Sequence, residues 1–312
     1  MELLSIASNP NSISKPNEEK MRIFLLLVSL ILPFNAKALE VVTSFSILAD
    51  MVKEVGGDKV NIKNLVGPNG DAHVYQPTPN DAKLIANSGL LVINGLGFEG
   101  WMSRLIKSSG YKGLVITASK GIKPLPLENS HHKHGYKHQD DPHAWQNLPN
   151  AKQYVLNIMA GLSLADPANA DFYKRNGQRY IEQIMSLDAE IRAKIAEIPS
   201  QNRKLVTSHD AFAYFAISYR IEFHSPTGLS TEAEASAHNV AKLITLIRKE
   251  KIRAVFVENI SDPRLLEQIL KESGAQIGGS LFSDALSNPQ GPAPTYLQMI
   301  RHNVTTLVEA LR

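Results

Sequence analysis

Histidine and aspartate side chains stand at positions where α/β proteins gather ligands. His73 ends a turn-rich loop, and His209 directly follows an expected strand over residues 204–207. Asp284 follows a second expected strand, residues 276–282. Because ligands collect outside the carboxyl ends of strands in open α/β sheets, such side chains are candidates for a shared site.

A third histidine, in the stretch Asp141-Pro142-His143-Ala144-Trp145, adds a further candidate ligand. Three imidazoles and one carboxylate suit a tetrahedral zinc ion, with bonds of about 2.0–2.2 Å. The same set binds manganese if the carboxylate is bidentate, although Mn²⁺ prefers more oxygen ligands and lies low in the affinity series. The candidate ligands of one divalent metal ion are therefore His73, His143, His209 and Asp284.

One long helix, expected over residues 167–198, separates these candidates into two pairs. Asp166 is a plausible N-cap, Pro167 suits the first helical position, and Pro199 ends the helix. At 1.5 Å per residue such a helix is roughly 48 Å long, more than one small domain needs. We expect it to join two lobes that hold the metal between them. Its apolar face, with steps of three, four or seven, comprises Tyr173, Tyr180, Ile184, Leu187, Ile191, Ile195 and Ile198.

Strands alternate with helices on both sides of this helix, which predicts α/β lobes with parallel sheets. The expected fold is thus two α/β lobes joined by one long rigid helix. The expected domains are an extension with a signal peptide over 1–38, an N-terminal lobe over 39–165, the linking helix over 166–199 and a C-terminal lobe over 200–312. The expected strands cover 41–45, 60–66, 90–94, 114–117, 204–207, 253–257 and 276–282.

Composition excludes several classes of function. The 312 residues are 43% hydrophobic and 20% charged, as in an ordinary globular protein. A formal net charge of +3 is too small to imply a nucleic-acid or membrane-surface partner. The chain has no cysteine, which excludes disulfides, thiolate nucleophiles and Cys-type zinc sites, so a soft-metal site must use histidine.

The N-terminus has the pattern of a secretory signal. Lys20 and Arg22 supply positive charge just before an almost unbroken apolar run over 23–34. Ala36-Lys37-Ala38 then offers an A-x-A cleavage site. A run of this length is too short to span a bilayer, and the alternative is a buried helix. Met21 is an alternative start. We expect a periplasmic monomer cleaved near Ala38, without a stable membrane anchor because no cysteine is present for lipid attachment.

Five stretches resemble, in order, the zinc- and manganese-binding solute receptors of ABC importers, also called cluster A-I or zinc-uptake periplasmic binding proteins. They are 70–81 (GDAHVYQPTPND), 94–101 (NGLGFEGW), 141–145 (DPHAW), 207–212 (TSHDAF) and 281–286 (LFSDAL). The resemblance covers nearly the whole mature chain. It implies two lobes joined by a rigid helix, a transported metal ion, an ABC transporter permease as partner and no enzymatic activity.

The resemblance also assigns roles to individual residues. Carried over by motif, the family's metal ligands fall on His73, His143, His209 and Asp284. In this family a histidine at the third position is typical of zinc receptors, whereas manganese or iron receptors often carry glutamate there. An aspartate ligand is typical of the manganese type. The resemblance therefore favours zinc, with manganese a close second.

Other polar residues have two interpretations each. The histidines of the 129–139 stretch resemble a short form of the His-rich loop of zinc receptors and are either a secondary capture site or a solvated polar loop. The stretches 230–234 and Glu258-Asn259 also resemble segments of the family. They either supply acceptors that orient the imidazoles or, as the simpler interpretation, start a helix or make a surface contact. Glu99 and Trp101 are expected to serve lobe packing. The loop histidines are His131, His132, His134 and His138, and the histidines expected at the surface are His224, His238 and His302.

Two other functions compete with a metal receptor. A zinc hydrolase needs an open coordination position and a general base, for which Asp210 or Glu232 would have to serve. Four protein ligands leave little room for a water molecule, and the chain has no H-E-x-x-H motif. A metal buffer or adhesin without a transporter is the third possibility.

Overall fold

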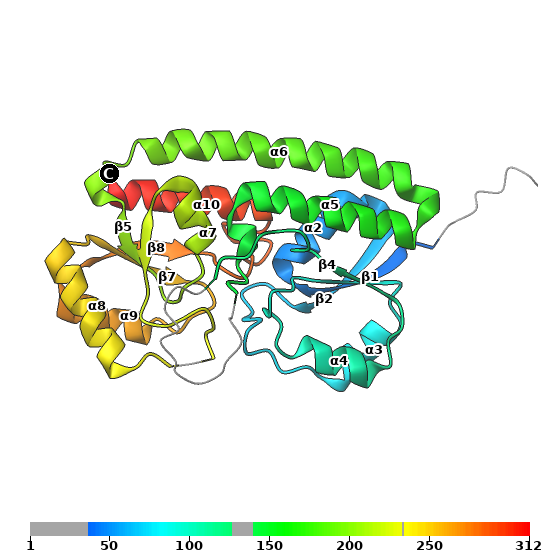
Figure 1. Ribbon diagram of the computed structural model, residues 1–312, viewed down its shortest axis with the longest axis horizontal. Coiled ribbons are helices and arrows are strands. Elements are labelled where there is room, and N and C mark those ends of the chain that lie inside the picture. The colour runs from blue at the N-terminus through cyan, green and yellow to red at the C-terminus, as the bar shows by residue number, and fades with distance from the viewer. Residues whose placement is uncertain (1–36, 127–139, 233) are drawn as a thin grey trace, which may run out of the picture. The chain divides into compact units, whose positions relative to one another are not determined.

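Two parallel four-stranded sheets organise the chain (Figure 1). The computed structural model describes residues 37–126, 140–232 and 234–312. Of the helices in these ranges, none combines the length and the apolar character that a membrane span requires. The expected signal segment lies outside the described residues, and so do the loop histidines. Residues 38–312 form one compact unit.

The N-terminal lobe is built on the sheet β2-β1-β3-β4, in which all neighbours are parallel. Val41 pairs with Leu90 and Val42 with Leu91, and all four side chains are buried. Such unbroken apolar runs fit strands whose two faces are both covered by helices. Figure 1 shows α2 and α5 on one face and α3 and α4 on the other. The bounds are β1 (Leu39–Phe45), α2 (Ser46–Gly56), β2 (Val60–Val66), α3 (Pro79–Ala86), β3 (Leu90–Ile93), α4 (Met102–Ser109), β4 (Leu114–Thr117) and α5 (Leu148–Ala165).

The C-terminal lobe repeats this plan with the parallel sheet β6-β5-β7-β8. Helix α10 packs against β8, while α8 and α9 contact each other on the opposite side (Figure 1). The strand β6 was not expected from the sequence, because its residues Glu222, Phe223 and His224 include only one apolar side chain. The bounds are β5 (Lys204–Val206), α7 (Ala213–Tyr219), β6 (Glu222–His224), α8 (Ala237–Glu250), β7 (Ala254–Glu258), α9 (Arg264–Ser273), β8 (Gln276–Leu281) and α10 (Tyr296–Leu311).

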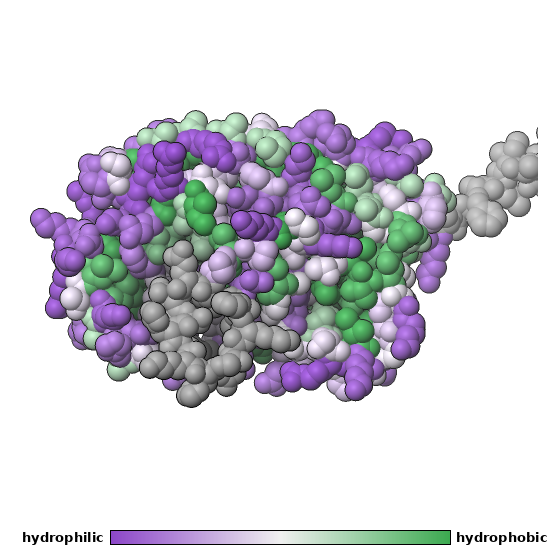
Figure 2. All heavy atoms as spheres, viewed as in Figure 1, coloured by the Kyte–Doolittle hydropathy of each residue, from purple (hydrophilic) through white to green (hydrophobic). Residues whose placement is uncertain are grey.

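The helix α6 (Ala170–Ala196) links the lobes, which confirms the expected architecture. It packs against α2 and α5 of the first lobe and α10 of the second, and it runs along both in Figure 1. Its 27 residues give a length of about 40 Å at 1.5 Å per residue. Polar side chains cover much of it on the viewed face (Figure 2). Short 3₁₀ turns lie at Gly57–Lys59, Ala144–Gln146, Pro167–Asn169 and Ser200–Asn202.

The prediction that Asp166 is the N-cap of the linking helix was wrong. Asp166 instead ends α5, and Pro167 begins a separate 3₁₀ turn before α6. Asp166 Oδ2 accepts hydrogen bonds from the Tyr173 hydroxyl and the Asn169 side-chain amide, both at 2.7 Å. The carboxylate is therefore used to brace the α5–α6 corner from the side. The domain boundaries at 39–165, 166–199 and 200–312 remain a prediction.

Candidate metal centre

Four side chains converge between the two lobes. The Nε2 atoms of His73 and His143 lie 3.3 Å apart. Asp284 Oδ2 lies 3.1 Å from His73 Nε2 and 3.2 Å from His209 Nε2, and Asp284 Oδ1 lies 3.6 Å from His143 Nε2. Ligand atoms bound tetrahedrally at about 2.0–2.1 Å stand about 3.3–3.4 Å apart, so the observed spacing fits one small cation.

Each of these side chains lies where the chain leaves a strand or enters a turn. His73 follows β2 and His143 directly precedes a 3₁₀ turn, so the first lobe supplies two imidazoles. His209 follows β5 and Asp284 follows β8 in the second lobe. One ligand atom from each residue lies within 4.8 Å of all the others. The structure therefore brings together all four residues that the sequence singled out.

Each histidine of the first lobe is held by a turn of the same kind, in which an aspartate two residues earlier accepts its backbone N–H. Asp71 Oδ1 accepts the backbone N–H of His73 at 2.8 Å, and Asp141 Oδ1 accepts that of His143 at 2.9 Å. In the second case the carboxylate also accepts from the ring Nδ1 at 2.7 Å. An acceptor on Nδ1 fixes the tautomer and leaves Nε2 free to coordinate.

Glu258 supports His209 from the end of the neighbouring strand β7. Its Oε1 accepts the His209 backbone N–H at 2.9 Å. Its Oε2 lies 2.6 Å from the ring Nδ1, although the two are not aligned as a hydrogen bond. Glu258 is buried, so the simpler interpretation of a surface or helix-start residue was wrong. The signal in the sequence was an acidic residue that ends an apolar strand.

The centre is shielded from water. The side chains of His143 and Asp284 are fully buried, and those of His209 and His73 are 1% and 5% exposed. Within the described ranges, both carboxylate oxygens of Asp284 and the Nε2 atom of His209 have no hydrogen-bond partner. A buried polar atom without a partner costs about 1–3 kcal/mol. Close approach without hydrogen-bond alignment is the pattern expected of ligands that share an ion.

Charge couples His143, His209 and Asp284 electrostatically. Burial lowers the pKa of His143, but Asp284 and Asp141 outweigh it and raise the pKa to about 9. Burial likewise opposes a charged His209, yet Glu258 and Asp284 raise its pKa well above the ordinary value. Burial would raise the pKa of Asp284, but the two imidazoles hold it well below its usual range. A cation that enters this centre therefore displaces protons.

Aromatic packing, one indole donor and one amide donor fix the frame around the centre. The rings of His73 and Phe98 meet edge to face, with centroids 4.7 Å apart. Trp145 Nε1 and Gln146 Nε2 both donate to the carbonyl of Ser283, at 3.0 and 2.7 Å. The turn that carries His143 is thereby tied to the residue before Asp284, across the two lobes.

Glu99 and Trp101 brace the first lobe. Trp101 Nε1 donates to the carbonyl of Ala72 at 2.8 Å, directly before His73. Glu99 Oε1 accepts from Ser44 Oγ and from the Asn94 backbone N–H, both at 2.6 Å. These contacts keep the loop that carries the first ligand in place.

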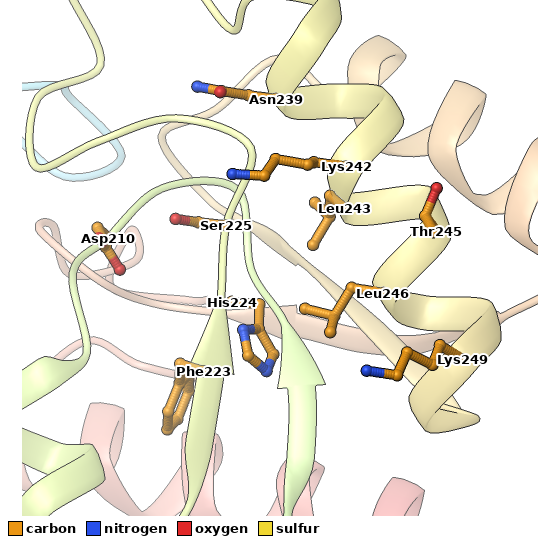
Figure 3. Close-up of a pocket in the computed structure, with 10 residues that line it drawn as sticks. All are labelled: Asp210, Phe223, His224, Ser225, Asn239, Lys242, Leu243, Thr245, Leu246 and Lys249. Carbon is orange, nitrogen blue, oxygen red and sulfur yellow. The ribbon is translucent and has the colours of Figure 1, made fainter. Parts of the chain in front are cut away.

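The remaining candidates do not join the four ligands. His224 and Asp210 line a separate cavity of about 570 Å³ beside α8, which also receives the side chains of Lys242 and Lys249 (Figure 3). His238 is exposed, and His302 lies close to the carbonyl of Ser280 at 3.0 Å. No member of the ligand set lines the cavity in Figure 3.

Comparison with known proteins assigns the chain to a family. A family model described as "Zinc-uptake complex component A periplasmic" matches residues 41–310. The chain belongs to this family. The iron-binding protein YfeA of Yersinia pestis is 36% identical over 276 residues, which cover 88% of this chain and 87% of the relative. The manganese ABC transporter substrate-binding lipoprotein PsaA of Streptococcus pneumoniae is 31% identical, with 89% and 90% covered.

Solved structures agree with this assignment. The periplasmic zinc-binding protein TroA of Treponema pallidum superposes with a TM-score of 0.82 at 33% identity, over 88% of this chain and 99% of that structure. A manganese-bound periplasmic metal-binding protein from Candidatus Liberibacter asiaticus gives a TM-score of 0.77 at 32% identity, with the same coverage. The chain is thus an extracytoplasmic metal-binding component of an ABC transporter. The family consists of transport receptors and not of enzymes. This finding contradicts the hydrolase hypothesis.

Proposed function

We propose that this protein captures Zn²⁺ between its lobes and delivers it to the membrane permease of an ABC importer. Three imidazole Nε2 atoms and one carboxylate would bind the transported ion. The observation that carries this proposal is their convergence, at tetrahedral spacing, in a centre almost closed to water. The ligands are His73, His143, His209 and Asp284.

Manganese is the second candidate cargo, and a specific observation supports it. Both oxygens of Asp284 lack a hydrogen-bond partner, so the carboxylate is free to bind in a bidentate manner, as Mn²⁺ requires. The relatives named above bind zinc, manganese or iron. Zinc comes first because His209 supplies nitrogen at the third position. Since such sites usually bind zinc more tightly, affinity alone does not fix the physiological cargo.

Metal analysis of protein purified without added metal, followed by competition between Zn²⁺ and Mn²⁺, tests the proposal. We expect one ion per chain at the centre, with zinc bound more tightly. His143→Ala should abolish tight binding, because it removes a buried ligand. His224→Ala is the matched control and should bind normally. Tight binding that survives in the His143 variant would contradict the proposed centre.

Delivery to a permease distinguishes a receptor from a metal buffer or adhesin. A helix that packs on both lobes favours small tilts and loop rearrangements over wide hinge closure. We also infer secretion through a cleaved signal, with a mature chain that begins near Leu39. Uptake of radioactive zinc by cells that lack their own receptor should be restored by this protein together with its permease. Binding without restored uptake would favour a buffer.

A further inference from the structure

The buried centre requires a route for the ion, and this inference rests on the proposed function. The ligand side chains are at most 5% exposed, so an ion enters or leaves only when part of the cover moves. A cavity of about 540 Å³ reaches this cover from outside. Asp71 of the first lobe and His209, Thr227 and Thr231 of the second lobe are among its lining residues. His209 therefore forms a wall between the cavity and the metal centre.

Asp71 touches both sides of this cavity. Its Oδ1 accepts the backbone N–H of the ligand His73, while its Oδ2 accepts the hydroxyl of Thr231 at 2.5 Å. Asp141 occupies the equivalent turn before His143, but its Oδ2 makes no hydrogen bond to the other lobe. Within the described ranges this oxygen is buried and has no hydrogen-bond partner. Asp71 thus joins the His73 turn to the loop that follows β6.

That loop, residues 225–232, is otherwise held by its own lobe. The Thr227 hydroxyl donates to the carbonyl of Ser208 at 2.7 Å, and the Asp210 backbone N–H donates to the carbonyl of Gly228 at 3.1 Å. Among the residues that the structure describes, the Thr231–Asp71 contact is the one hydrogen bond between this loop and the first lobe.

Elsewhere the hydrogen bonds between the lobes differ in burial. The one from Asn259 Nδ2 to Asn69 Oδ1, at 3.0 Å, is also exposed, whereas those made by Tyr296 are buried. The Tyr296 backbone N–H donates to Asp50 at 2.8 Å, and its hydroxyl donates to the Trp145 carbonyl at 2.6 Å. Opening the molecule there breaks hydrogen bonds that water does not reach. Asp71 and Thr231 are only half-buried, so water can replace their hydrogen bond when the loop moves. The contact on the cavity side is therefore easier to open than the buried contacts of Tyr296.

We propose that the Thr231–Asp71 hydrogen bond is a latch that holds the 225–232 loop over the cavity and sets the rate of metal exchange at His209. When the latch opens, the loop moves away from the first lobe and water gains access to the ring of His209. The ion then leaves toward the second lobe's side of the cavity. Thr231 and Asp71 act on the rate of exchange, whereas the four ligands determine whether the ion binds.

The test is the rate at which the Zn²⁺-loaded full-length mature chain releases zinc to an excess of a colour-changing chelator. Thr231→Val keeps the shape of the side chain and removes its hydroxyl. We expect release about tenfold faster, because a hydrogen bond to a charged acceptor is lost. Thr231→Ser keeps the hydroxyl and should release zinc at the wild-type rate.

Thr227→Val is the matched control, since it removes a hydrogen bond from the same loop but not from between the lobes. Its release rate should stay within about twofold of wild type. A wild-type rate in Thr231→Val, or equal acceleration in Thr227→Val, would overturn the latch. Failure of the proposed function looks different: the wild-type chain itself would then show no stoichiometric zinc to release, and both proposals would fall together.

Discussion

At the scale of single residues, the metal preference depends on the third ligand. We predict that His209→Glu shifts the ratio of zinc to manganese affinity toward manganese, because an oxygen donor replaces a nitrogen. The change also brings a third carboxylate close to Glu258 and Asp284, which are both buried. The metal-free variant should therefore unfold at a lower temperature. Competition titrations measure the ratio, and an unchanged ratio would refute a selectivity role for this position.

Glu258 is predicted to position the imidazole of His209. Glu258→Gln removes the negative charge beside Nδ1 while retaining an acceptor for the backbone N–H. We expect zinc affinity to fall about 10- to 100-fold, as for other residues that orient a metal ligand. Glu222→Gln, at an exposed glutamate beside His224, is the control and should bind zinc normally. Calorimetry measures both. Equal affinities for Glu258→Gln and wild type would remove this role.

Proton release follows from the raised pKa values in the centre. Because His143 has a pKa of about 9 and that of His209 is also raised, these two imidazoles carry protons at neutral pH when no metal is bound. An ion must displace these protons, so apparent zinc affinity should rise with pH from 6 toward 9 and fall on acidification. Calorimetry in buffers of different ionisation enthalpy counts the protons released. Equal affinity at pH 5 and pH 7.5 would contradict ligation by histidine.

At the scale of elements, the prediction that remains concerns the function of the polar stretch 129–139. Its four histidines lie outside the described residues, and we predict that they capture zinc weakly before transfer. Deleting the stretch should slow zinc uptake from dilute solution and remove weak binding, because the additional imidazoles are gone. The tight site should keep its affinity. Equilibrium dialysis with excess zinc measures the stoichiometry; an unchanged stoichiometry would favour a merely solvated loop.

Periodicity predicted the elements well where they are long. The heptad-like spacing of Tyr173, Tyr180 and Leu187 predicted α6, and apolar runs predicted every strand of the first sheet. Two features were missed. Strand β6 has only one apolar residue, and the bracing role of Asp166 depends on the direction in which α6 returns. Local sequence does not specify either feature.

The candidate site was predictable in its ligands, whereas among their supports the sequence offered Glu258 only as one of two interpretations. His73 and His209 stand in motifs that the sequence displays directly. Glu258 contacts His209 because β7 lies beside β5, a strand order that spacing along the chain does not reveal. Asp71 and Thr231 are separated by 160 positions and meet only after both lobes have formed.

At the scale of the whole molecule, the two lobes are halves of one binding site. In each lobe at least one ligand follows a strand of the sheet, and each lobe contributes two ligands. The shared hydrogen bonds of Trp145 and Gln146 to Ser283 hold these halves in register. We predict that binding of an ion by both lobes ties their relative position to occupancy. Under the proposed function, this coupling would let a permease distinguish the loaded receptor from the free one.

Anomalous diffraction from zinc-soaked crystals is the decisive experiment for coordination of one ion by both lobes. We expect one strong peak about 2.0–2.2 Å from the Nε2 atoms of His73, His143 and His209 and from a carboxylate oxygen of Asp284. A crystal in which these side chains point apart, with zinc bound elsewhere, would contradict it.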